Sequence, residues 1–266
     1  MSEITKEPSA EANVPPAPDQ EIQGPTRLSR SILWDLQRRF FDGQGLDAWN
    51  GGGVPSYITC NPRIALSYVR VLLGFLRDLR APDSPFGPLD PDKPVNVIEL
   101  GAGSGRFSYP LLRRLAAAQE LPACRGPRVR YIMTDFTDAN VQAWRSIDAF
   151  KPFVEQGLLD FARFDAEHDE TISLAVSGEV LAPDSGQNPI VVVANYLFDT
   201  IVHDAFVVKA GALHENRVRV LAPKPADELV TDPAAIVQVK LDWEAVPAFL
   251  PYYDDPAWDA VLEYYR

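Results

Sequence analysis

The stretch Glu99-Leu100-Gly101-Ala102-Gly103-Ser104-Gly105-Arg106 decides the fold of this chain. It follows the apolar segment Val95–Leu100, which predicts a buried strand, and it leads into Arg106–Gln119, whose apolar residues recur at helical spacing. Glycines between a strand and a helix let the backbone turn sharply and approach a ligand closely. The stretch therefore predicts a ligand-binding loop at the first strand-to-helix turn of an α/β domain.

The alternation of strand and helix continues beyond this loop. Val129–Asp135 predicts a second strand, and Thr137 is placed to cap a helix over Asp138–Phe150. Leu159–Asp165 predicts a third, weaker strand, and the apolar run Ile190–Asn195 predicts a central one. Such an order is typical of βαβ units with a parallel sheet. In open sheets of this kind, ligands bind at the carboxyl ends of the strands.

The flanking segments predict the domain organisation. Residues 1–26 are rich in Pro, Ala and Glu and predict a disordered tail, and residues 27–94 predict a helical segment with a proline-rich connector. We expect residues 95–266 to form the ligand-binding domain, with a hairpin insertion near residues 205–220. The sheet is expected to be incomplete at its C-terminal end, either because the chain is a fragment or because Ile236–Trp243 fills that edge.

Composition excludes several classes of protein. The chain has 266 residues, 46% of them hydrophobic, and a net charge of −12, which argues against binding to duplex nucleic acid or to an anionic membrane. Cys60 and Cys124 form neither a disulfide framework nor part of a Cys/His cluster, so no metal site is expected. The apolar runs are far shorter than the ~20 residues that span a bilayer. The acidic residues near the N-terminus oppose a targeting peptide, so we expect a cytoplasmic protein.

The glycine spacing distinguishes two kinds of cofactor loop. A dinucleotide-binding loop has the spacing G-x-G-x-x-G, which would need a glycine where Arg106 stands. The spacing here is G-x-G-x-G, with Glu99 two residues before the first glycine. This pattern resembles motif I of the class I S-adenosylmethionine (SAM) methyltransferases. In that interpretation, amides at the helix N-terminus meet the carboxylate of SAM, and Glu99 meets its ammonium group. A turn that needs glycine only for packing is the alternative.

Residues at the ends of the next strands extend the predicted cofactor site. Asp135 is placed to accept hydrogen bonds from ribose hydroxyls, Phe136 to lie against adenine, and Asp165 to meet its exocyclic amine. Each has an ordinary alternative: an acid at a helix N-terminus, a core phenylalanine and a solvated surface acid, respectively. The predicted cofactor-binding residues are Glu99, Gly101, Ala102, Gly103, Gly105, Asp135, Phe136, Asp165, Ala166 and Asn195.

The fourth strand leads into Asn195-Tyr196-Leu197-Phe198-Asp199-Thr200, at the edge expected nearest the transferred methyl group. Asn195 can hold a substrate donor, Tyr196 can pack on a cationic or planar substrate, and Asp199 can receive a proton or pair with a guanidinium. These three are the predicted catalytic residues. The alternative is a strand end with a capped turn and a core Tyr/Phe pair. His203 follows closely, but a single histidine is a weak catalytic indication.

Two further stretches resemble the MidA-like methyltransferases, a family that includes a mitochondrial complex I assembly factor that methylates arginine. Residues 188–206 are similar to its ANE-FFDALPV-QF block, and residues 57–62 are similar to its FxTSPE segment. The resemblance covers roughly residues 50–215. It implies a Rossmann-like fold, SAM binding and methyl transfer. Tyr196 stands where the family has an acidic residue, which puts an arginine substrate in doubt.

Two functions from different classes remain open from the sequence. The first is a SAM-dependent methyltransferase that acts on a protein or small-molecule acceptor. Methyl transfer is an in-line displacement that needs alignment and exclusion of water more than a general base. The second is a methyltransferase-like scaffold or assembly partner without catalysis. A nicotinamide-dependent oxidoreductase is disfavoured by the glycine spacing. The expected fold is α/β, with a Rossmann-like methyltransferase sheet and flanking helices.

Overall fold

The computed structural model describes residues 18–49, 58–120, 127–231, 236 and 238–266. The chain divides into two compact units. The larger unit is Gln37–His203, and the smaller unit joins Met1–Leu36 to Asp204–Arg266. The boundary at residue 36 falls inside helix α1 (Ile32–Gln44). None of the helices among the described residues combines the length and the apolar character needed to cross a bilayer.

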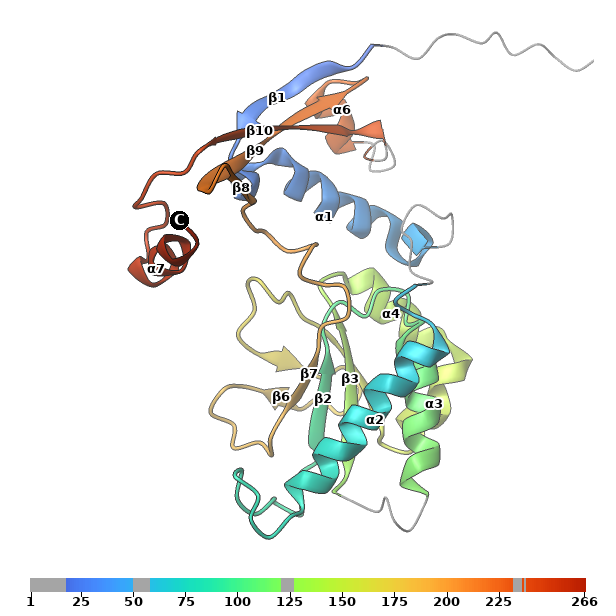
Figure 1. Ribbon diagram of the computed structural model, residues 1–266. Helices are drawn as coiled ribbons and strands as arrows, with labels where there is room; N and C mark the ends of the chain where they lie inside the picture. Colours follow the sequence, from blue (N-terminus) through green and yellow to red (C-terminus); the bar gives the residue numbers. More distant parts are fainter. Residues whose placement is uncertain (1–17, 50–57, 121–126, 232–235, 237) are drawn as a thin grey trace, which may run out of the picture. The chain divides into compact units, whose positions relative to one another are not determined.

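The larger unit is built on a four-stranded parallel sheet with the strand order β4-β3-β2-β7 (Figure 1). Its strands are β2 (Val95–Glu99), β3 (Val129–Asp135), β4 (Leu159–Arg163) and β7 (Val191–Val193). Strand β2 pairs in parallel with β3 on one side and with β7 on the other. Strand order reverses between β2 and β7, which is the point where open α/β sheets bind ligands. The predicted α/β fold with a parallel sheet is confirmed.

Helices cover one face of this sheet. They are α2 (Pro62–Leu79), α3 (Ser108–Gln119), α4 (Asp138–Ser146) and α5 (Lys151–Glu155), together with the 3-10 turns η2 (Gly45–Trp49) and η4 (Asp148–Phe150). Helix α2 begins at Asn61, whose side chain accepts hydrogen bonds from the next two free amides. Helix α4 begins after the predicted cap Thr137 but ends at Ser146, short of Phe150.

The core of the larger unit explains why both faces of its strands are apolar. Val95, Val97 and Tyr131 point to the helix-covered face, where they pack with Leu111 and Leu112 of α3. Other strand residues point to the opposite face, which is covered by the short strands β5 (Ile172–Ser173) and β6 (Val180–Leu181). Each fully buried large apolar side chain stabilises the fold by about 1.5–3 kcal/mol.

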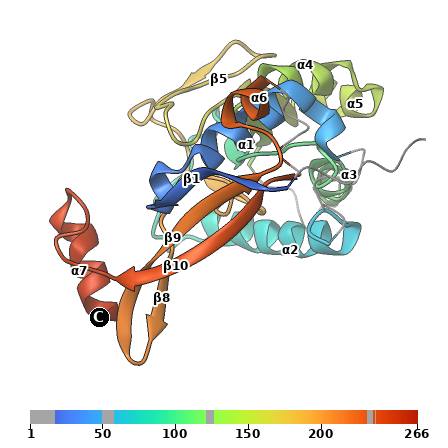
Figure 2. The same cartoon turned by 90° about the horizontal axis from the view of Figure 1, so that it is seen from above.

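The smaller unit is an antiparallel sheet with helices. Strands β1 (Gln20–Thr26), β9 (Ala212–Ala222) and β10 (Lys240–Pro247) lie in the order β1-β9-β10, and β8 (Phe206–Lys209) also pairs with β9. Figure 2 shows β8 and β9 as a long hairpin. The remaining elements are η1 (Leu28–Arg30), α6 (Ala226–Thr231) and α7 (Pro256–Tyr265). Leu28 and Trp34 pack against Val218 and Val220 of β9.

The flanks of the sheet differ from the sequence-based expectations. Gln20–Thr26 was expected in a disordered tail but forms β1, because pairing with β9 satisfies its backbone; residues 1–17 lie outside the described part. The expected hairpin exists, but it belongs to the smaller unit with the rest of Asp204–Arg266, so the domain expected over residues 95–266 extends across a unit boundary. Ile236–Trp243, the candidate for the parallel sheet edge, instead contributes to β10 beside β9.

Candidate functional site

A cavity of about 400 Å³ lies in the larger unit, at the carboxyl ends of β2, β3, β4 and β7. This volume is within the range of small-molecule sites. The residues that follow each of these strands contribute to its wall, as expected for an open parallel sheet. Most of the predicted site residues line it together: Gly101, Ala102, Gly103, Asp135, Phe136, Asp165, Ala166, Asn195, Tyr196 and Asp199. Glu99 and Gly105 lie outside the wall.

Steric constraints explain the glycines of the loop. Gly101, Gly103 and Gly105 have φ values of +64°, +52° and +71°, a region that side chains other than glycine rarely adopt. A Cβ atom on Gly103 would lie 2.7 Å from the ring of Trp49, which itself lines the cavity. The fold therefore requires glycine here even before any ligand is considered.

The loop is also held by its own hydrogen bonds. The amide of Gly103 donates to Asp135 Oδ2 at 3.1 Å, and the carbonyl oxygen of Gly103 accepts from Trp144 Nε1 at 2.9 Å. The amide of Ala102 donates to the carbonyl oxygen of Thr134, and that of Gly105 to Ala102. These three amides therefore hold the loop in place within the protein. We call this part of the cavity, residues 100–104 with Asp135, the loop end.

Asp135 is buried at the loop end, with 4% of its surface exposed. Its Oδ1 atom accepts hydrogen bonds from the amide and the hydroxyl of Thr137, both at 3.1 Å. Burial raises the pKa of Asp135, and these hydrogen bonds oppose the rise. Its carboxylate thus joins the glycine loop to the turn before α4. Its place in the cavity wall is compatible with a ribose contact made by its remaining lone pairs.

Glu99 lies behind the loop rather than in the cavity wall. It accepts hydrogen bonds from Ser108 Oγ at 2.6 Å and from the Tyr131 hydroxyl at 2.8 Å, and 2% of its surface is exposed. Burial raises the pKa of Glu99 to about 7. The structure therefore places this acid at the end of β2, where it bonds to α3 and β3.

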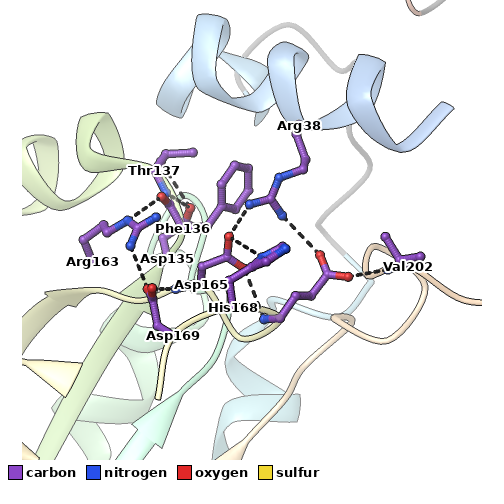
Figure 3. A network of polar contacts seen from close by, with 10 residues as sticks. Arg38, Asp135, Phe136, Thr137, Arg163, Asp165, His168, Asp169 and Val202 are labelled. Atoms are coloured by element: carbon purple, nitrogen blue, oxygen red, sulfur yellow. Dashed lines mark hydrogen bonds and ion pairs between the residues drawn. The ribbon is translucent and has the colours of Figure 1, made fainter. Parts of the chain in front are cut away.

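Arg38 of α1 forms an ionic cluster in another part of the cavity wall (Figure 3). Its guanidinium pairs with Asp165 and, at 3.1 Å, with Glu167. The guanidinium carbon lies 4.7 Å from the centre of the Phe136 ring. We call Arg38, Phe136, Asp165 and Glu167 the arginine end. No motif marks Arg38, so the sequence analysis missed it.

The charge of Asp165 is stabilised within this cluster. Burial raises the pKa of Asp165, but the backbone amide of Glu167 and the guanidinium of Arg38 outweigh burial, so the pKa lies below its usual range. His168 Nδ1 lies 3.2 Å from the same carboxylate. Asp165, Glu167 and His168 have the spacing of possible metal ligands, but the guanidinium of Arg38 already supplies the positive charge that two of them need.

Arg38 occupies the place that the sequence predicts for adenine. It covers the face of Phe136 and bonds to Asp165, the two residues expected to bind that base. A ring inserted between the guanidinium and Phe136 would need about 7 Å, twice the ~3.5 Å of one van der Waals contact. The observed 4.7 Å is too short. A base can insert between the guanidinium and Phe136 only after the Arg38 side chain moves.

The predicted catalytic residues lie at the end of β7. Asn195 lines the cavity, and its Nδ2 atom donates to the carbonyl oxygen of Thr59 at 3.3 Å. Tyr196 has a φ of +61°, a strained conformation for a bulky residue. Tyr196 and Phe198 are 68% and 71% exposed, so the alternative of a core Tyr/Phe pair is wrong. Asp199 also lines the cavity.

Comparisons with known proteins give distant structural similarities. No family model matches the chain, and no curated protein matches it. Two solved structures from Burkholderia thailandensis match, with TM-scores of 0.41 and 0.45 and identities of 18% and 17%. The first is an uncharacterized COG1565 superfamily protein, and the second is described as "a COG1565 superfamily member and likely methyl transferase" bound to S-adenosyl-homocysteine. Each match covers 90% of this chain, which spans about half the length of those proteins.

Proposed function

We propose that the larger unit binds SAM in the cavity at the ends of β2, β3, β4 and β7 and transfers its methyl group to an acceptor. The observation that carries this proposal is the charge of the cavity wall. Its charged residues are four carboxylates and one guanidinium: Asp135, Asp165, Glu167, Asp199 and Arg38. SAM carries a sulfonium and an ammonium against one carboxylate, so its net charge is complementary to this wall. A dinucleotide carries two phosphates, which the wall repels.

The glycine loop supports the same proposal. Its spacing resembles motif I, and it lies at the point where the strand order reverses. The bound cofactor would supply an activated methyl group. The chain would contribute orientation: Asp135 toward the ribose, Asp165 and Phe136 toward the base, and Asn195 toward the amino-acid end. Membership of the MidA-like family and the identity of the acceptor, protein or small molecule, remain part of this proposal.

A non-catalytic scaffold is the second candidate function. The contacts of Arg38 with Phe136 and Asp165 favour it, because they fill the predicted base position without a ligand. The two candidates differ in one respect: a scaffold does not convert SAM to S-adenosylhomocysteine (SAH) in the presence of any acceptor. We favour the enzyme, because one flexible arginine side chain can leave the site by rotation alone.

Calorimetric titration tests the binding step. We expect SAM and SAH to bind in the micromolar range and NAD not to bind. Equal affinity for NAD, or no affinity for SAM and SAH, would overturn the proposal. Production of SAH with protein and small-molecule acceptor pools then separates the enzyme from the scaffold.

A further inference from the structure

A second cavity, of about 610 Å³, lies in the larger unit beside the start of α2 and along α3. Cys60, just before α2, lines both this cavity and the candidate SAM site. The second cavity therefore adjoins the candidate SAM site. The rest of its wall consists of Pro62, Arg106, Tyr109, Pro110, Arg113, Arg114 and Ala117.

The wall of this cavity has an unusual charge for this chain. Three of its eight residues are arginines, Arg106, Arg113 and Arg114, and none is Asp or Glu. The whole chain has a net charge of −12. Helix α2 beside it carries one acid, Asp78, which pairs with Arg77. A positive region in an acidic protein creates a local field that attracts anionic groups.

The two arginines of α3 are exposed at the cavity. Arg113 and Arg114 are exposed, and among the described residues neither forms an ion pair. The guanidinium of Arg113 lies 6.0 Å from the ring centre of Tyr109, which is also exposed. Arg106 lies in the turn before α3 and lines the same cavity. The wall thus offers guanidinium groups next to an aromatic ring.

We propose that this second cavity docks an acidic segment of a protein, namely the methyl acceptor of the neighbouring site. The assignment of that segment to the acceptor rests on the proposed methyltransferase function. Guanidinium groups bind carboxylates through paired hydrogen bonds, and Tyr109 with Pro62, Pro110 and Ala117 offers contacts for apolar side chains.

The charge of the chain favours a short acidic segment over a nucleic acid. A polyanion such as DNA carries a phosphate at every nucleotide and would extend past the cavity to the acidic remainder of the chain. The carboxylates of a short peptide segment interact only with charges within about 8–10 Å, the screening distance in physiological salt. A segment bound in the cavity would therefore interact mainly with its arginines. A phosphate backbone also offers no apolar side chain that could pack on the apolar part of the cavity wall.

Fluorescence anisotropy tests the docking with a labelled twelve-residue peptide of alternating Glu and Ala. The full chain is compared with the double variant Arg113→Glu/Arg114→Glu and with a matched double variant, Arg145→Glu/Lys209→Glu. The matched variant changes the net charge equally at exposed residues outside the cavity. We expect the affinity for the peptide to fall at least tenfold in the first variant and less than threefold in the second. The same peptide with Lys in place of Glu should not bind.

Three outcomes would overturn the proposal: no binding of the acidic peptide by the unaltered chain, an equal loss in both double variants, or tighter binding of a twelve-nucleotide oligothymidylate that is lost with Arg113→Glu/Arg114→Glu. SAH titration of the same variants separates this inference from the proposed function. We expect unchanged SAH affinity in both. Absence of SAH binding in every variant would overturn the proposed function, while the peptide measurement would still decide the docking.

Discussion

The two ends of the cavity are built in different ways. At the loop end, neighbouring groups hold the backbone: Asp135 accepts from the amide of Gly103, and Trp144 donates to its carbonyl oxygen. At the arginine end, a side chain from α1 lies on Phe136 and pairs with two carboxylates. The first end is defined by backbone geometry, and the second by charge.

This difference predicts how each end responds to a ligand. The loop end cannot move without losing buried hydrogen bonds and meeting the steric limits at its glycines. The arginine end can rearrange by rotation of one long side chain. We therefore expect the loop end to keep its shape when a cofactor binds, and the arginine end to change.

Gly103→Val should have the largest effect on the loop end. The new side chain would meet Trp49 at a backbone φ of +52°, so we expect SAH affinity to fall at least a hundredfold, with a lower melting temperature. The matched control is Gly178→Val, where φ is +73° but no atom lies within 4 Å. It should lower the free energy of unfolding by the backbone strain alone, about 1–2 kcal/mol, and leave SAH affinity unchanged. Calorimetry and thermal unfolding measure both effects; SAH binding by Gly103→Val would show that the loop does not shape the site.

Asp135→Ala tests whether the loop end also binds ligand. It removes the acceptor of the Gly103 and Thr137 amides, so we expect lower stability. Loss of the proposed charge-assisted hydrogen bond to the ribose, worth about 1.5–3 kcal/mol, should lower SAH affinity about ten- to hundredfold. Asp138→Ala removes an exposed acid of α4 and should change stability by at most about 1 kcal/mol and SAH affinity not at all. Urea unfolding and calorimetry check these values. Reduced stability with unchanged SAH affinity would make Asp135 a purely structural residue.

Arg38→Met tests the arginine end of the cavity. If the guanidinium competes with adenine, SAH affinity should rise about three- to tenfold, whereas stability should fall because Asp165 loses its partner. Arg39→Met, an exposed neighbour on the same helix that does not line the cavity, is the control. A loss of SAH affinity in Arg38→Met alone would mean that Arg38 contacts the cofactor instead of competing with it.

Glu99 predicts a pH dependence of stability behind the loop end. Its pKa is raised from 4.5 to about 7, so between these values the folded state holds a proton that the unfolded state has lost. The contribution of Glu99 to stability is therefore greatest below pH 4.5 and decreases as the pH rises toward 7. Glu99→Gln should reduce this decrease in denaturant unfolding followed across the same pH range. An identical pH profile in both proteins would contradict the buried position of the acid.

Much of the fold follows from local sequence patterns. The apolar strands, the glycine loop and the cap at Thr137 are where the sequence predicts them. The sheet of the smaller unit was harder to predict, because β1 and β9 pair across about 200 positions, as in Glu21 with Leu221. No local signal in residues 20–26 indicates that partner, and the composition by itself favours disorder.

For the site, the sequence determined which strand ends meet. Parallel strands bring Gly103, Asp135 and Asp165 to one edge of the sheet, and this follows from the order of strands and helices alone. Only the tertiary structure decided that Glu99 lies behind the loop and that Arg38 pairs with Asp165, a residue 127 positions away. The spacing of apolar residues along a strand or a helix is a property of neighbouring residues and is visible in the sequence. The pairing of distant charges depends on packing that no short stretch of sequence contains.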